Sequence, residues 1–269
     1  MKAFNGSVDF KNRLLAGVAK HVNAGDIVQG EKFYWDGTKG CAVGCTIHSS
    51  DHRTYEKAYQ IPTSLAYLKD TIFENLPPQL AQEWTSRFLS AIVPGADLSS
   101  VTSQLMVWLL TDPKDGVLMF TTNKPPMTDA IKAVSGLHSA VLVGEEVTKE
   151  TWSKAITTAI KAADSQRYVM VKINSERAAP QGAGKAWAAA AWSAWAVKAF
   201  EEGTVVSKMQ AAAAAVWAAV RAAELMVADE DGVVTSKAGA GAALEKSSLH
   251  YEKIADKLVA LLKSAPMGV

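Results

Sequence analysis

The chain has 269 residues, of which 28 are basic and 27 acidic, so its formal net charge is only +1. That balance excludes the strong positive field that attracts nucleic acid or an anionic membrane surface, and we expect neither partner. Two cysteines do not make a disulfide framework, so we expect reduced thiols in a cytoplasmic protein. The N-terminus lacks the apolar segment of a signal peptide, so we expect none. The sequence contains no run of 18 strongly apolar residues, so we also expect no membrane-spanning helix.

The first elements in chain order are a helix and an irregular loop. Apolar residues from Phe10 to Val22 recur at helical spacing, and Gly25 ends this predicted helix. Residues 26–39 show no period, because glycines and the Trp35-Asp36-Gly37 turn interrupt it. An irregular loop that contains glycines and aromatic residues therefore follows the first helix.

Helical signals continue beyond this loop. Pro62 predicts the start of a helix that ends at Leu76-Pro77-Pro78, and the next helix runs to Pro94-Gly95. Asp97 is a predicted N-cap for a helix that extends through Leu109. Residues 111–126 form the clearest break; helices resume over about 127–143 and 148–164, and 168–173 alternates weakly, as a strand would.

The last third is rich in alanine and tryptophan. Helices are predicted over 185–202 and to about 228, then a polar loop over 229–241, then a helix from Leu244 to Leu261. These elements predict an all-α fold, a compact bundle of about nine to eleven helices. We expect one domain over 1–269, with portions 1–110, 111–180 and 181–269.

The segment from Lys39 to His52 holds both cysteines and two of the five histidines. Cys41, Cys45, His48 and His52 fall at i, i+4, i+7 and i+11, which places them on one stripe of a continuous helix. Zinc is a possible cofactor there, with Cys41, Cys45 and His48 as candidate ligands. One ion cannot reach all four residues, since Cys41 and His52 lie about 16 Å apart along such a helix unless it breaks at Ser49-Ser50. The alternative is a set of packed, non-ligating side chains, and no cofactor is predicted.

A pocket for an anion or a nucleotide is a second hypothesis for the same segment. Lys39-Gly40 precedes a predicted helix N-terminus, where free amides favour phosphate, and Gly44 would allow close approach. The aromatic pair Tyr34-Trp35 could stack on a base. The opposing interpretation is that the glycines admit a neighbouring helix. The full set of candidate ligand-binding residues is His21, Asp26, Gln29, Tyr34, Trp35, Lys39, Gly40, Cys41, Gly44, Cys45, His48, Asp51 and His52.

A thiol nucleophile is the third hypothesis. Cys41 or Cys45 near a helix N-terminus would have a lowered pKa, and His48 or His52 could act as its base. No hydrolase signature surrounds these residues, and most free cysteines are small buried apolar side chains. The catalytic residues of such an enzyme are therefore unassigned.

Both ends of the chain resemble an uncharacterised family of bacterial and phage proteins. The matching pieces are His21, Asp26-Ile-Val-Gln-Gly30, Tyr34-Trp35, Lys39-Gly-Cys-Ala-Val-Gly-Cys-Thr46, Asp51-His52, Ile61-Pro62, Thr71-Ile-Phe-Glu-Asn-Leu-Pro77 and Tyr251-Glu-Lys-Ile-Ala-Asp-Lys-Leu258. The alanine-rich portion also looks loosely like putative bacterial immunity proteins. The resemblance implies an accessory protein carried by bacteria or phages, and it supplies no catalytic residues.

These observations favour a non-enzymatic binding protein. Its expected ligand is a small phosphorylated or nucleotide-like molecule, or a bacterial or phage protein, with a possible role in phage–host conflict by sequestering a signalling nucleotide. One alternative is a metal- or thiol-dependent hydrolase or transferase that uses Cys41, Cys45, His48 and His52. Another is a helical inhibitor of the immunity type.

Overall fold

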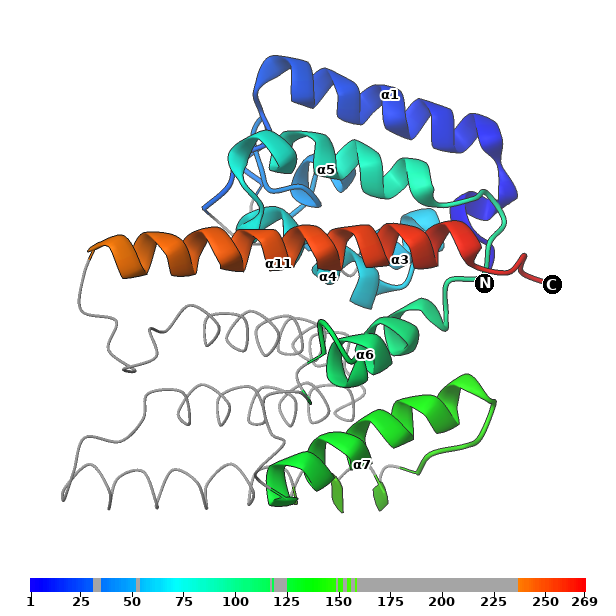
Figure 1. Cartoon of the computed structure of the whole chain (residues 1–269). Coiled ribbons are helices and arrows are strands. Elements are labelled where there is room, and N and C mark those ends of the chain that lie inside the picture. Colours follow the sequence, from blue (N-terminus) through cyan, green and yellow to red (C-terminus); the bar gives the residue numbers. More distant parts are fainter. Residues whose placement is uncertain are drawn as a thin grey trace. The chain divides into compact units, whose positions relative to one another are not determined.

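A computed structural model gives the fold of the chain (Figure 1). It describes residues 1–30, 35–51, 54–116, 118, 125–148, 150, 151, 154, 155, 158 and 237–269, of which 67, 75, 127 and 237–250 are described by backbone alone. These residues form helices, turns and isolated bridges, with no strand among them, which confirms the all-α prediction. Of the helices described, none has the length and apolar character needed to cross a membrane.

The chain divides into two compact units. The first comprises Met1–Leu105 and Tyr251–Val269, and the second comprises Met106–His250. The final helix α11, Lys237–Ser264, therefore gives its C-terminal half to the unit that contains the N-terminus. The predicted helices over 185–202 and to 228, and the possible strand over 168–173, lie outside the described residues.

Most described helices belong to the first unit. In chain order they are the 3-10 helix η1 (Ala3–Gly6), α1 (Val8–Ala24), α2 (Gly44–Ile47), α3 (Thr54–Tyr59), α4 (Thr63–Asn75), α5 (Pro78–Ala91) and α6 (Val101–Thr111), which continues into the second unit from Met106 onward. The second unit also contains α7 (Pro125–Leu142). The sequence did not predict the short elements η1 and α3, because neither is long enough to show a helical period.

Helix α1 ends where its sequence predicts, and a side chain caps its start. Ser7 is the N-cap, and its hydroxyl accepts a hydrogen bond from the Phe10 amide at 3.1 Å. Gly25 closes the helix in the left-handed region, with φ of 70°, and its amide donates to the last turn. A left-handed C-cap suits glycine, which has no Cβ to clash with the preceding carbonyl. The irregular loop predicted from residue 26 therefore begins directly after this cap.

Helix α4 lies at the centre of the first unit. Its side chains Leu65, Leu68, Ile72 and Phe73 are fully buried. Helix α5 packs against both α4 and α1, and it contributes the buried Trp84. Helix α11 runs beside α5, where Arg87 and Asp256 form an exposed ion pair (Figure 1). The core thus forms around α4, a helix whose start at Pro62 the sequence predicted.

Three predicted boundaries are wrong. Asp97 does not cap α6, which starts at Val101; instead its carboxylate accepts from the Ser99 amide at 3.0 Å, and this bond lowers the pKa of Asp97. Helix α7 includes the Pro125-Pro126 pair, since proline is tolerated in a first helical turn, where no amide partner is needed. Helix α11 begins at Lys237, inside the segment predicted as a loop, where alanines favour a helix despite the glycines.

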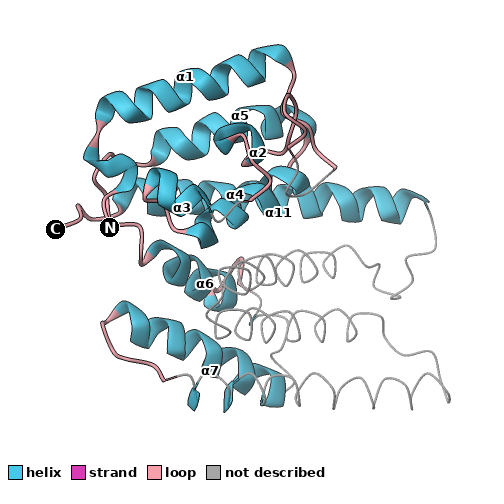
Figure 2. Cartoon of the chain, turned by 180° about the vertical axis from the view of Figure 1, so that it is seen from behind, coloured by secondary structure: helices cyan, strands magenta, loops and turns pink. Residues whose placement is uncertain are grey.

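The two ends of the chain meet on one short segment. The Ala3 amide donates to the Ala96 carbonyl at 2.9 Å, and the Gly95 amide donates back to Ala3 at 2.8 Å. From the other side, the Gly268 amide donates to the Gly95 carbonyl at 2.8 Å, and Ala96 pairs with Met267. Figure 2 shows both termini at this place. Residues 95–97 are therefore held between the two ends.

Candidate functional site

The loop after α1 is folded back on itself around Gly40. The Gly40 amide donates to the Asp26 carbonyl at 3.0 Å, and the Val28 amide donates to the Gly40 carbonyl at 2.9 Å. The Asp36 carboxylate accepts from the amides of Thr38 and Lys39 at 2.8 and 2.7 Å, which closes the turn. These bonds bring both ends of the loop to the C-terminal end of α1.

Gln29 fastens the same loop to α4. Its side-chain amide donates to the carbonyls of Phe73 at 2.6 Å and Leu76 at 2.9 Å, at the end of that helix. Beside it, the Gly30 amide donates to the Glu74 carboxylate at 2.7 Å. Gln29 was a candidate ligand-binding residue, but its donor group is occupied in capping a helix.

The single continuous helix that was predicted to align two cysteines and two histidines does not form. Helix α2 covers only Gly44–Ile47, and His48 ends it in the left-handed region with φ of 52°. The break therefore comes at His48, ahead of the Ser49-Ser50 break considered from the sequence. His52, like Tyr34, lies outside the described residues. Cys41 precedes the helix, so the i, i+4, i+7 geometry fails.

Both cysteines are buried and free of disulfides. The Cys45 thiol donates to the carbonyls of Gly40 at 3.4 Å and Asp26 at 3.5 Å. Burial, with the nearby negative charge of Asp26, raises the pKa of Cys45 to about 11. The sulfur of Cys41 accepts from the Gly44 amide at 3.2 Å. This environment opposes the activation that a thiol nucleophile needs, since a raised pKa keeps the thiol protonated.

The glycines of this segment have no free amide to offer a phosphate. Gly40 and Gly44 are buried, and their amides donate to Asp26 and to the Cys41 sulfur. The Cys45 amide donates to the Cys41 carbonyl at 3.0 Å. A helix of one turn also has a small dipole. The interpretation that these glycines allow close packing fits this arrangement better than an anion pocket at the start of α2.

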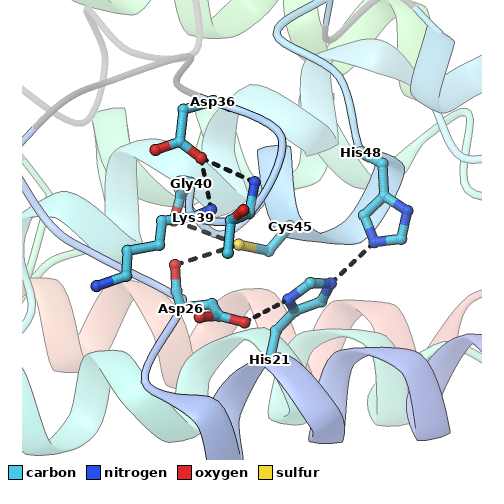
Figure 3. Close-up of polar contacts among 8 residues, drawn as sticks. His21, Asp26, Asp36, Lys39, Gly40, Cys45 and His48 are labelled. Atoms are coloured by element: carbon cyan, nitrogen blue, oxygen red, sulfur yellow. Dashed lines mark hydrogen bonds and ion pairs between the residues drawn. The ribbon is translucent and has the colours of Figure 1, made fainter.

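Four other candidates come together at the end of α1, and we call His21, Asp26, Trp35 and His48 the imidazole cluster. His21 Nδ1 lies 3.1 Å from Asp26 Oδ2, and His21 Nε2 lies 2.8 Å from His48 Nε2 (Figure 3). The Trp35 ring stacks on His48, with centroids 4.9 Å apart and planes at 22°. The rings of His21 and Trp35 lie nearly perpendicular, with centroids 5.7 Å apart.

The hydrogen bonds of the cluster determine which ring nitrogens carry protons. Asp26 accepts a hydrogen bond from His21 Nδ1, so a neutral His21 keeps a lone pair on Nε2. His48 Nε2 must then be the donor in the contact between the two rings. A neutral His48 consequently keeps its lone pair on Nδ1. Since His48 is exposed, the Nδ1 of this ring is the nitrogen of the cluster that is open to a ligand at the protein surface.

The remaining candidates lie near the cluster without joining it. Lys39 is exposed, and Figure 3 shows its side chain on the opposite side of Asp26 from His48. The Asp51 carbonyl accepts from the amide and the hydroxyl of Thr54, at 3.0 and 2.8 Å, at the start of α3. Of the residues predicted from sequence, the structure thus brings His21, Asp26, Trp35 and His48 together at the surface.

Sequence reasoning missed Lys69, which lies beneath the cysteine segment. It is completely buried, and its ammonium donates to Thr46 Oγ1 at 2.6 Å and the Ala42 carbonyl at 3.0 Å. Burial lowers the pKa of Lys69 to about 7, against the opposing effect of Asp70. The available signal was position: Lys69 is four residues after Leu65 and lies on the apolar face of α4.

In the part of the chain that the structure describes, no three histidine, cysteine or acidic side chains are grouped to hold one metal ion. Two imidazoles do face each other, as given above. The chain matches no protein-family model, no curated protein and no solved structure in the three comparisons made.

Proposed function

We propose that this chain is a non-enzymatic binding protein whose ligand is small, anionic and nucleotide-like, and that the ligand binds at the imidazole cluster. The stacked pair of Trp35 and His48 carries the proposal. His48 is exposed and Trp35 is partly exposed, so aromatic surface remains open to a planar ligand. Aromatic side chains in such positions stack on bases.

Hydrogen bonding adds a polar contact beside this aromatic surface. A protonated His48 would donate from Nδ1 to a phosphate oxygen, while its Nε2 keeps the contact with His21. Asp26 holds His21 in place through Nδ1. A nucleotide has both a planar base that can stack and a phosphate that can accept charge-assisted hydrogen bonds. It therefore fits this surface better than a purely apolar or a purely ionic ligand.

Binding without catalysis is favoured by the state of the thiols. Cys45 is buried with a raised pKa, and Cys41 is buried beside it, so neither is an accessible nucleophile. The free thiols also support a cytoplasmic location, which belongs to this proposal. A role in phage–host conflict, by sequestering a signalling nucleotide, rests on the resemblance described above, as does a protein partner from a bacterium or phage.

Titration calorimetry of the full chain with AMP, ATP and inorganic phosphate tests the proposal. Base–aromatic stacking contributes about 1–3 kcal/mol, so Trp35→Ala should weaken AMP binding by roughly 5- to 160-fold. His48→Asn should also weaken it while tolerating the left-handed backbone at that position. Neither change should affect the folded state, which circular dichroism would verify.

Lys20→Ala provides the matched control, because Lys20 is an exposed residue of α1 outside the cluster. Its affinity for AMP should equal that of the unmodified chain. If AMP, ATP and inorganic phosphate all fail to bind, both with and without an added divalent metal ion, the nucleotide proposal is refuted. Equal affinity in Trp35→Ala and the unmodified chain would place the ligand elsewhere.

A further inference from the structure

We infer that His21 and His48 together bind a divalent transition-metal ion between their Nε2 atoms. This inference deepens the proposed function, on which it rests for the identity of the anionic ligand, because the ion would be the positive charge that attracts that ligand. Two imidazole nitrogens from distant parts of the chain face each other at 2.8 Å. His21 lies in the last turn of α1, whereas His48 follows α2.

The distance between the two nitrogens is close to the distance expected when two imidazole nitrogens bind the same ion. Imidazole nitrogens bind zinc at about 2.0–2.1 Å, so two of them on one ion lie roughly 2.9–3.4 Å apart for angles from 90° to the tetrahedral value. Opening the 2.8 Å contact by a few tenths of an ångström and tilting the exposed His48 ring would reach this range. The inter-ring proton would move through solvent to His48 Nδ1, so the neutral pair need lose no proton.

Asp26 already holds His21 as a metal ligand would need it. The carboxylate binds His21 Nδ1, which leaves the Nε2 lone pair directed toward His48. Metal-bound histidines usually have such a carboxylate or carbonyl on the other ring nitrogen, where it fixes the tautomer and raises the basicity of the ligand. Asp26 is therefore a positioning residue in this site, not a ligand of the ion.

The coordination sphere would be open. Within the described ranges no third histidine, cysteine or acidic residue joins the pair, and the Cys45 thiol is directed at two carbonyl oxygens. Water or an anion would fill the other positions of the ion. With neutral imidazoles, Asp26 leaves the cluster negative; a divalent ion reverses that sign and provides direct coordination for a phosphate or carboxylate.

Calorimetric titration of the untagged, chelator-treated chain with Ni²⁺ or Zn²⁺ tests the site. We expect one ion per chain, at least tenfold weaker binding in His21→Ala and in His48→Asn, and a 10- to 100-fold loss in Asp26→Asn. Asp9→Asn changes an exposed carboxylate elsewhere on α1 and should bind as tightly as the unmodified chain. Cu²⁺ should also quench Trp35, measured as the difference in quenching between the unmodified chain and Trp35→Phe.

Undiminished affinity in His21→Ala and His48→Asn, or no binding at all, would overturn the inference; circular dichroism must show that both variants fold. AMP titrations with Ni²⁺ and with chelator separate this inference from the proposed function. AMP binding that needs Ni²⁺ supports both. Ni²⁺ binding without AMP binding refutes the nucleotide ligand alone, and equal AMP binding in chelator refutes the role of the ion.

Discussion

Lys69 is a buried amine whose hydrogen-bond partners are uncharged. Among the residues that the structure describes, no carboxylate forms an ion pair with it. Its ammonium is bonded to Thr46 and Ala42, and the rings of Tyr55 and Phe88 lie 5.6 and 5.9 Å away. The Trp84 indole donates to the Lys69 carbonyl at 2.8 Å, which fixes the backbone there. The surrounding apolar groups disfavour the charged form. Protonation of Lys69 therefore couples pH to the stability of the first unit.

The free energy of unfolding should rise with pH from about 7 to about 9. The pKa of Lys69 is about 7 when folded and 10.5 ordinarily, so in this window the unfolded chain holds a proton that the folded chain lacks. One such proton gives a slope of about 1.4 kcal/mol per pH unit. Lys69→Met should abolish the rise in urea unfolding followed by tryptophan fluorescence.

Lys20→Met is the control for that measurement, since Lys20 is exposed and its removal should leave the slope intact. Above pH 9 an opposite trend begins, because the raised pKa of Cys45 keeps the folded thiol protonated where the unfolded thiol ionises. A slope that persists in Lys69→Met would show that another group causes it.

At the scale of the helix, α1 and its C-cap each have one glycine, and the two glycines have opposite backbone requirements. Gly25 has φ of 70°, whereas Gly17 lies inside the helix, and a Cβ at either position meets nothing within 4 Å. An added methyl group would therefore cause no steric clash at either position, and the two positions differ only in backbone conformation. Gly25→Ala should lower the free energy of unfolding by about 1 kcal/mol through left-handed strain, and Gly17→Ala should raise it by about 0.5–1 kcal/mol.

Urea unfolding of the two single variants measures this difference, and each variant is the control for the other. Effects of the same sign at both positions would contradict the assigned C-cap. The comparison also shows why the end of α1 could be predicted: the cap depends on one residue and its own dihedral angles. The end of α2 could not be predicted in this way, since His48 adopts a left-handed conformation that histidine tolerates but does not signal.

At the scale of the molecule, the first unit is closed by its two termini. A Cβ on Gly268 would clash with the Met1 carbonyl oxygen and would lie 3.2 Å from Lys2 Cγ. Gly268→Ala should therefore separate the ends and lower the free energy of unfolding by about 1–3 kcal/mol, as overpacking does. Amide exchange of residues 95–97 should become faster, because these residues contact both ends.

Val269→Ala is the control, since Val269 is fully exposed and its substitution removes no buried contact. Unchanged exchange at 95–97 in Gly268→Ala would mean that the C-terminal residues do not hold this segment. The division of the chain into two units would have been hard to infer, because the first unit combines residues 1–105 with residues 251–269.

The sequence by itself determined the helical class, the C-terminal end of α1 and the start of α4, because spacing, caps and prolines act within a few residues. It also identified the residues of the imidazole cluster without showing which of them meet. Only the tertiary structure decided that His21 contacts His48, 27 residues away, and that Lys69 lies beneath the cysteines. Such contacts depend on which distant segments pack together, and burial then decides whether a thiol, an amide or an amine can reach a ligand.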